Sequence, residues 1–166
     1  MFAQNYYFWK SFQECSLKYI QKLSYNTKVN RQTPRIYIAL PVMDEMERLP
    51  LLMKAIKEQT FEDFSLVVCV NQPDIWWNNP GHVDVCKENQ LTIKYLQSLD
   101  DKRIEIIDRS SPGKGWPVKG HGIGVARKLL MDHISKIANA ADIIISMDAD
   151  TVFGPDYLAS VAENLR

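Results

Sequence analysis

The stretch Ala141-Asp-Ile-Ile-Ile-Ser-Met-Asp-Ala-Asp-Thr151 decides how this chain folds. Its three consecutive isoleucines predict a strand that is buried on both faces, as strands are in a parallel sheet covered by helices. Two carboxylates, Asp148 and Asp150, follow where the apolar run ends. Because residues two apart on a strand share a face, both carboxylates should project from the carboxyl edge of the sheet, where open α/β sheets bind ligands.

This acidic pair indicates a divalent cation. Two carboxylates a few ångströms apart repel each other and lose solvation unless a cation neutralises them. Oxygen ligands suit a hard ion such as Mg²⁺ or Mn²⁺. An isolated Asp-x-Asp is more often a solvated turn, but the strand before this one and the helix after it favour a metal site.

The rest of the chain predicts strands and helices that alternate. Apolar runs predict further strands over residues 35–41, 64–70 and 103–108. Apolar residues at helical spacing predict helices that begin near Pro50, cover 85–99 and 125–139, and begin again at Gly154-Pro155. We therefore expect one α/β domain over residues 34–166, with a mostly parallel, Rossmann-like sheet flanked by helices.

Residues 1–33 are expected to form an N-terminal helical extension. Their apolar residues predict an amphipathic helix from about residue 5 to residue 23. Basic residues are too few for a typical membrane-binding helix, so packing against the domain's own flank is the favoured interpretation. Docking to a partner or to a membrane surface is the alternative.

Composition bounds the class of protein. A length of 166 residues, with 46% apolar and 24% charged residues, is typical of one globular domain. The 20 basic and 20 acidic residues cancel, which argues against nucleic acid as the main partner. The three cysteines lack metal-binding spacing, and no apolar run reaches membrane-spanning length. We therefore expect a cytoplasmic location.

Polar side chains follow the ends of several predicted strands. If the crossovers are right-handed, Asp44 and Asn71 meet the acidic pair at one edge of the sheet. Such a cluster suits a ligand with a base, a ribose and a diphosphate, since a cation on Asp150 would neutralise phosphate oxygens. Trp76 and Trp77, in the loop after the second strand, either stack on the ring of a ligand or cap the core.

A glycine- and proline-rich loop spans residues 110–124. Its glycines lower the barrier to backbone rearrangement, so we expect residues 110–122 to be mobile until a ligand orders them. Lys114 and Lys119 in this loop, and Arg127 just after it, are candidates to contact phosphates. For the two lysines, a solvated loop is an equally good interpretation.

Five segments of the chain stand in an order typical of one enzyme family. They are Ile38–Glu45, the helix end Lys57–Gln59, Val67–Asn71, Gly124–Lys128 and Ile144–Asp150. Together they resemble the family 2 glycosyltransferases of the GT-A fold, over about residues 34–165. The resemblance implies a nucleotide-sugar-binding domain with a UDP- or GDP-sugar as donor and Mn²⁺ or Mg²⁺ as cofactor. It also implies peripheral association of the full-length protein with a membrane.

The resemblance assigns roles residue by residue. It implies that Asn71 faces the base, Arg127 the phosphates, and Asp148 the ribose or the metal. The contacts to the nucleotide-sugar that it implies are Pro41, Asp44, Glu45, Asn71, Arg127 and Asp148, and the metal ligands are Asp148 and Asp150. Lys114 is a further expected contact, from its place in the glycine-rich loop. Met43 stands where that family usually has Tyr, and Asn71 where it usually has Asp. Because an amide carbonyl can also accept from a ring N–H, the identity of the base stays open.

In that family, the acceptor-binding half follows the Asp-x-Asp segment. The chain ends at Arg166, so we expect it to be the donor-binding half of a transferase, with no assigned general base and poor transfer by itself. A non-catalytic nucleotide-binding or interaction module of the same fold is the alternative. More remotely, Asp148–Thr151 fits the Asp-x-Asp-x-Thr signature of haloacid-dehalogenase-type phosphatases, whose further lysine and acids lie well downstream.

Overall fold

The computed structural model of the protein describes residues 34–117 and 122–165. The predicted N-terminal helix and Lys119 lie outside these residues.

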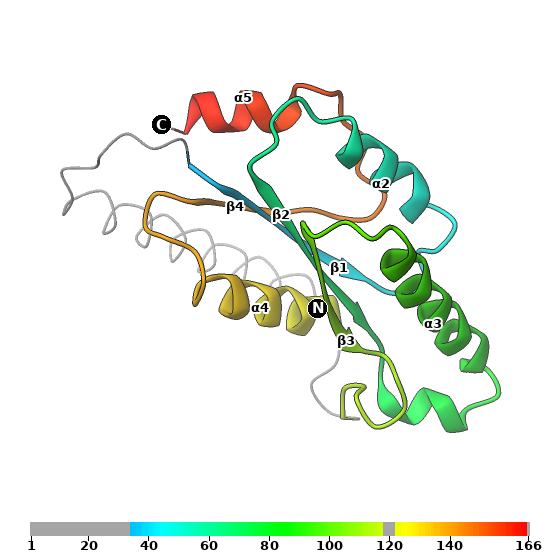
Figure 1. The fold of residues 1–166 in the computed structure, drawn as a ribbon. Coiled ribbons are helices and arrows are strands. Elements are labelled where there is room, and N and C mark those ends of the chain that lie inside the picture. Colours follow the sequence, from blue (N-terminus) through cyan, green and yellow to red (C-terminus); the bar gives the residue numbers. More distant parts are fainter. Residues whose placement is uncertain (1–33, 118–121, 166) are drawn as a thin grey trace, which may run out of the picture. The chain divides into compact units, whose positions relative to one another are not determined.

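A four-stranded parallel sheet forms the centre of the domain (Figure 1). Its strands are β1 (Ile36–Val42), β2 (Phe64–Asn71), β3 (Ile104–Arg109) and β4 (Ile143–Ser146), in the spatial order β3-β2-β1-β4. All strand pairs are parallel, so the carboxyl ends of the strands lie along one edge. The predicted α/β architecture with a parallel, Rossmann-like sheet is confirmed.

Helices cover both faces of the sheet (Figure 1). The helices α2 (Leu49–Lys57), α3 (Val83–Ser98) and α5 (Tyr157–Asn164) pack on one face, and α4 (Ile123–Ile134) packs on the other. A short 3-10 helix, η1 (Asp74–Asn78), follows β2. The helix predicted over 125–139 begins two residues earlier and ends at Ile134. Among the described residues, no helix has both the length and the apolar character needed to cross a membrane.

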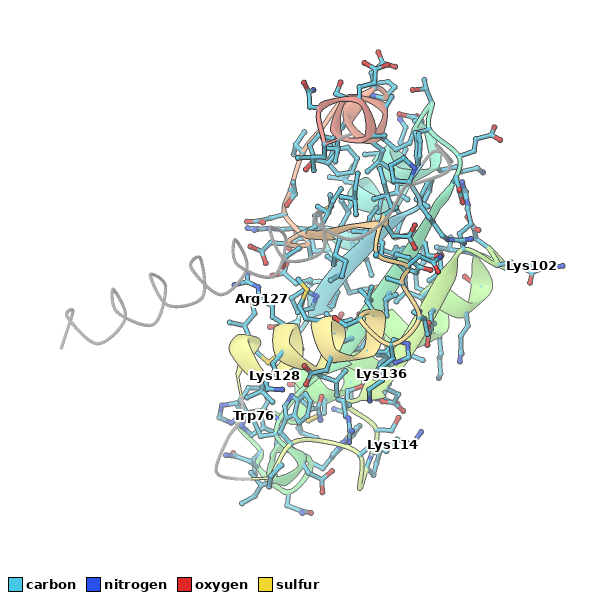
Figure 2. All side chains as sticks on the ribbon, turned by 90° about the vertical axis from the view of Figure 1, so that its left-hand side faces the viewer. Trp76, Lys102, Lys114, Arg127, Lys128 and Lys136 are labelled. Carbon is cyan, nitrogen blue, oxygen red and sulfur yellow. The ribbon has the colours of Figure 1, made fainter. Side chains whose placement is uncertain are left out.

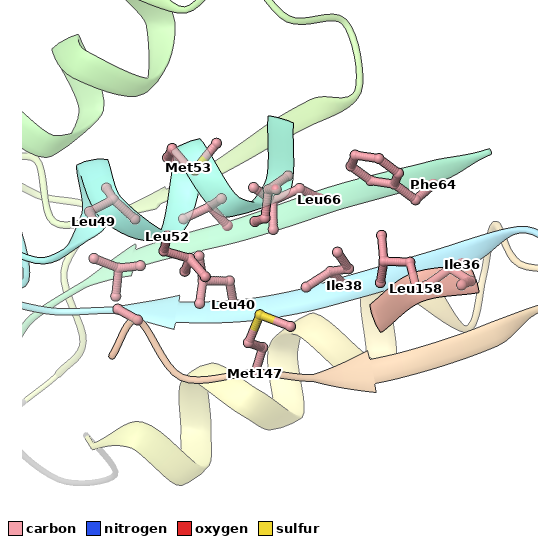
Figure 3. Close-up of a cluster of buried hydrophobic side chains, with 14 of the residues drawn as sticks. Ile36, Ile38, Leu40, Leu49, Leu52, Met53, Phe64, Leu66, Met147 and Leu158 are labelled. Atoms are coloured by element: carbon pink, nitrogen blue, oxygen red, sulfur yellow. The ribbon is translucent and has the colours of Figure 1, made fainter. Parts of the chain in front are cut away.

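Alternation of side chains along β1 and β2 divides the core into two halves. Ile36, Ile38 and Leu40 point into the larger half, against α2 and α5 (Figure 3). Tyr37 and Ala39 point into the smaller half, against α4. Each fully buried leucine or isoleucine contributes roughly 1.5–3 kcal/mol, so these contacts hold the helices against the sheet. They thereby fix the positions of the loops at its carboxyl edge.

The strand β4 differs from the sequence prediction. Its three isoleucines predict burial on both faces, but only Ile143 is buried, and Ile144 and Ile145 are half-buried. The reason is its position, because within the described residues β4 lies at the edge of the sheet and pairs only with β1. The strand also ends at Ser146, so the two carboxylates follow it in a turn.

Candidate functional site

A tight turn of residues 148–151, here called the acidic turn, carries the two carboxylates. Met147 and Ala149 are buried, whereas Asp148 and Asp150 are exposed. The Thr151 amide donates to the Asp148 carbonyl (3.1 Å), and the Asp148 amide donates to Thr151 Oγ1 (3.3 Å). Because the residues that alternate with them are anchored in the core, both carboxylates are directed outward.

Each carboxylate of the acidic turn has its own arginine. Arg127, which projects from α4 (Figure 2), donates from Nη2 to Asp148 Oδ1 at 2.5 Å. Arg48, the residue before α2, places Nη1 3.7 Å from Asp150 Oδ2. From the sequence, Arg127 was predicted to contact a phosphate, and no role was predicted for Arg48. The only sequence signal for Arg48 is its place in the charged turn after a strand that ends at the ligand-binding edge.

The segment after the acidic turn is anchored to the end of α2. Gln59 is buried, and its Nε2 donates to the Gly154 carbonyl (2.9 Å) while its Oε1 accepts from the Leu158 amide (3.0 Å). The Thr60 amide donates to the Pro155 carbonyl (2.9 Å). The residues at both ends of α2 thus contact the acidic turn or the segment that follows it.

At the end of β2, the Asn71 side chain is committed to contacts within the protein. It is 3% exposed. Its Nδ2 donates to the Val42 carbonyl (3.0 Å), and its Oδ1 accepts from Trp116 Nε1 (3.1 Å). Asn71 therefore ties the end of β1 to the loop after β3. To form hydrogen bonds with the base of a nucleotide, the Asn71 side chain would first have to break these two bonds.

Asn89 of α3 continues this buried network. Its Oδ1 accepts from the Asp44 amide (2.9 Å), and its Nδ2 donates to Gln72 Oε1 (2.8 Å). Gln72 Nε2 in turn lies 2.8 Å from Cys86 Sγ. The hydrogen bond that the Asp44 amide donates to Asn89 supports Asp44 in a left-handed conformation (φ 59°), which is uncommon outside glycine. The Asp44 side chain remains exposed at the carboxyl edge.

Pro41, near the end of β1, and Glu45, three residues after that end, have structural roles that the sequence did not predict. Pro41 is buried within the strand. The carbonyl of Ala39, two residues before it, accepts a hydrogen bond from the Met147 amide. The backbone of Pro41 therefore points toward β4, but it lies beyond the last residue pair between β1 and β4. The N–H that proline lacks is not needed there. The Glu45 carbonyl accepts from the Arg48 and Leu49 amides and so begins α2.

The first half of the glycine-rich loop is held by Asp108 of β3. Asp108 Oδ1 accepts from the Ser110 and Ser111 amides (3.0 and 2.9 Å), and its Oδ2 lies 3.0 Å from Lys114 Nζ. Burial alone would raise the pKa of the Asp108 carboxyl. The bonds from Ser111, Ser110 and Lys114 outweigh burial and hold that pKa well below its usual range. Lys114 thus pairs with Asp108, well away from Arg127 (Figure 2).

The same loop runs beside the residues that follow β2. The Trp116 amide donates to the Gln72 carbonyl (2.8 Å), and the Asp74 amide donates to the Trp116 carbonyl (2.9 Å). A Cβ on Gly115 would lie 2.6 Å from Asp74 N and Cα, so this close approach requires glycine. These contacts argue against a mobile lid over residues 110–117, because the backbone there is bonded to its neighbours.

The two adjacent tryptophans also make internal contacts. Trp76 stacks on His82, with ring centroids 4.4 Å apart and an interplanar angle of 21°. Trp77 Nε1 donates to the Ser110 carbonyl at 2.9 Å. Of the two interpretations left open by the sequence, capping of the fold is favoured over stacking on a ligand.

The oxygen donors of the acidic turn fit a hard divalent cation. Asp148 and Asp150 are exposed, and they share a turn whose backbone is anchored in the core. Across residues 34–117 and 122–165, no cluster of three or more His, Cys, Asp or Glu side chains suits a metal ion. Two carboxylates fill part of an octahedral shell, and phosphate oxygens and water commonly complete the shell of Mg²⁺.

The fold and the edge site define a parallel α/β domain with a potential ligand site at its carboxyl edge. No protein-family model matches the chain, and no curated protein shows significant similarity to it. The resemblance to glycosyltransferases therefore rests on the motifs quoted above.

Proposed function

We propose that this domain binds a nucleotide-sugar through Mn²⁺ or Mg²⁺ held by Asp148 and Asp150, as the donor-binding part of a glycosyltransferase. The observation that carries the proposal is the exposed acidic turn directly after β4, at the carboxyl edge of a parallel sheet. Ligands of open α/β sheets bind at this edge.

The chemistry of the site supports a diphosphate as the anionic part of the ligand. A cation bound there would neutralise phosphate oxygens and ease departure of the diphosphate. Arg127 orients Asp148 and retains further N–H donors on its guanidinium, a group that suits phosphate. Asp44 and Glu45 lie after β1 at the same edge, where they suit hydroxyl and ring N–H donors of the nucleoside.

Three further residues stabilise the structure around the site in this proposal. Asn71 fixes the end of β1 and the position of Trp116, and Pro41 is buried beneath the edge. Lys114 orders its loop through Asp108. The choice between a UDP- and a GDP-sugar then depends on groups other than the Asn71 amide.

One observation favours a second function, a non-catalytic module of the same fold. Both carboxylates of the acidic turn already have an arginine partner, so the turn is neutralised without a cation. Such a module would bind its ligand equally well with and without metal. A phosphatase of the haloacid dehalogenase type is disfavoured, because that signature follows the first strand of its fold, whereas here it follows the fourth strand of the described residues.

Calorimetry with UDP-glucose and GDP-mannose, in Mn²⁺ or in EDTA, tests the proposal. We expect one of them to bind only with Mn²⁺, and Asp150→Ala to weaken that binding at least tenfold. Asp63→Ala is the matched control, because Asp63 pairs with Arg35 at 3.6 Å before β2, at the opposite edge. Equal affinity in EDTA and Mn²⁺ would favour the non-catalytic module, and turnover of a phosphate ester would favour the phosphatase.

A further inference from the structure

The two arginines beside the acidic turn are held differently. Arg127 is 28% exposed and makes a direct hydrogen bond to Asp148. Arg48 is 59% exposed, and its 3.7 Å distance from Asp150 exceeds that of a hydrogen bond. Asp150 is also mostly exposed. The first pair is thus a fixed contact, whereas the second is an exchangeable ion pair.

The fold uses the backbone of Arg48. Its amide donates to the Glu45 carbonyl (3.1 Å), and its carbonyl accepts from the Leu51 amide (3.0 Å) to form the first turn of α2. These bonds persist whatever the side chain is. The long guanidinium arm can therefore leave Asp150 without any change in α2.

A divalent cation and the Arg48 guanidinium are competitors for Asp150. Both are positive and both are attracted to the same carboxylate, so a cation that binds there repels the guanidinium. A nucleoside diphosphate that arrives with the cation adds negative oxygens beside the displaced guanidinium, and arginine pairs well with phosphate. Arg48 should therefore oppose the cation alone and favour the cation with a diphosphate.

We propose that Arg48 is an exchangeable counter-ion of Asp150, which leaves the carboxylate when Mn²⁺ binds and then contacts the diphosphate. This inference rests on the proposed function. In this role, Arg48 weakens the binding of the free cation and strengthens the binding of the cation together with its diphosphate. Because exposed ion pairs contribute little, each effect should be about two- to fivefold in affinity.

The test measures two affinities in the full chain, Mn²⁺ alone by electron paramagnetic resonance and UDP in saturating Mn²⁺ by calorimetry. We expect Arg48→Gln to bind Mn²⁺ about two- to fivefold more tightly and UDP correspondingly more weakly. Arg48→Lys, which keeps the charge, should stay near the wild-type Mn²⁺ affinity. Arg35→Gln removes an arginine from a similar ion pair at the opposite edge and should change neither affinity.

Each outcome decides the matter. Tighter Mn²⁺ binding and weaker UDP binding in Arg48→Gln alone would support the inference. If wild-type protein binds Mn²⁺ through Asp150 but Arg48→Gln behaves like wild type, or loses Mn²⁺ affinity, the inference is wrong and the proposed function stands. Equal shifts in Arg48→Gln and Arg35→Gln would reduce the effect to net charge and overturn it. If neither wild type nor Arg48→Gln binds Mn²⁺, the proposed metal site and the inference both fail.

Discussion

Two regions of one sheet edge use polar residues in opposite ways. The first, here called the amide corner, lies where α3 meets the ends of β2 and β3 and consists of Asn71, Gln72, Asn89, Asp108 and Trp116. Its polar atoms are largely buried and form hydrogen bonds within the protein. The three amide residues and Trp116 bond to one another, and Asp108 accepts from Ser110 and Ser111. The second is the acidic turn, whose carboxylates are exposed and paired with arginines. A polar residue at a ligand-binding edge is therefore a candidate ligand only where burial and internal bonds leave it available.

The energetics of the two regions differ accordingly. A buried polar group left without its partner costs about 1–3 kcal/mol. An exposed ion pair contributes about 0–1 kcal/mol. Substitutions in the amide corner should therefore lower the free energy of unfolding, and those in the acidic turn should mainly change binding.

The largest expected effect is that of Asn71→Asp, which would restore the residue usual in the resembling family. The carboxylate would face the Val42 carbonyl in a buried site, so we expect a loss of about 3 kcal/mol or more at pH 7. Burial raises the pKa of the new carboxyl above its unfolded value. Stability is therefore retained at low pH and lost as pH rises, and the loss should be smaller at pH 4.

Urea unfolding of wild type and Asn71→Asp at both pH values measures this difference. A loss below about 1 kcal/mol, or one equal at the two pH values, would mean that the Asn71 side chain is free. The sequence-based role for Asn71 at the base would then regain support.

A smaller effect is expected for Asp108→Asn, which keeps an oxygen acceptor but removes the charge opposite Lys114. We expect a loss of about 1–2 kcal/mol near neutral pH. The pKa of Asp108 is depressed in the folded protein, so its contribution is present above the unfolded pKa of about 3.9 and is lost as pH falls below it. The deficit of the variant should therefore shrink below about pH 4.

Asp150→Asn makes the same chemical change in the acidic turn and serves as the matched control. We expect it to alter the free energy of unfolding by at most about 0.5 kcal/mol, measured in the same urea titrations. If Asp150→Asn cost as much as Asp108→Asn, the distinction between the two regions would be lost.

Much of the fold could be predicted because strands that are buried on both faces appear in the sequence as short, continuous apolar runs, and β1 is buried at every residue and β2 at all but one. The strands β1, β2 and β3 begin and end within one or two residues of their predicted positions for this reason. The burial of Ile144 and Ile145 could not be predicted, because it depends on which strand lies at the edge. Strand order is a property of the assembled sheet, and periodicity does not encode it.

The candidate site divides in the same way. The position of Asp148 and Asp150 after a strand at the carboxyl edge follows from the local sequence. The partners Arg48 and Arg127 depend on how separate elements meet, so the sequence identified only Arg127, and at a phosphate. Asn71 appeared available for the same reason, because nothing local shows that Trp116 and Val42 occupy its amide.

Paramagnetic broadening by Mn²⁺ tests the central claim most directly, because it locates the cation within the molecule. In isotope-labelled protein with UDP, we expect Mn²⁺ to broaden the amide signals of residues 148–151 and Arg48. The signals of Asp101 and Lys102, which precede β3 at the opposite edge of the sheet, should persist, and Asp150→Asn should restore the broadened ones. Broadening centred on Asp74 and Asp108, or the same broadening in Asp150→Asn, would contradict a cation site at the acidic turn.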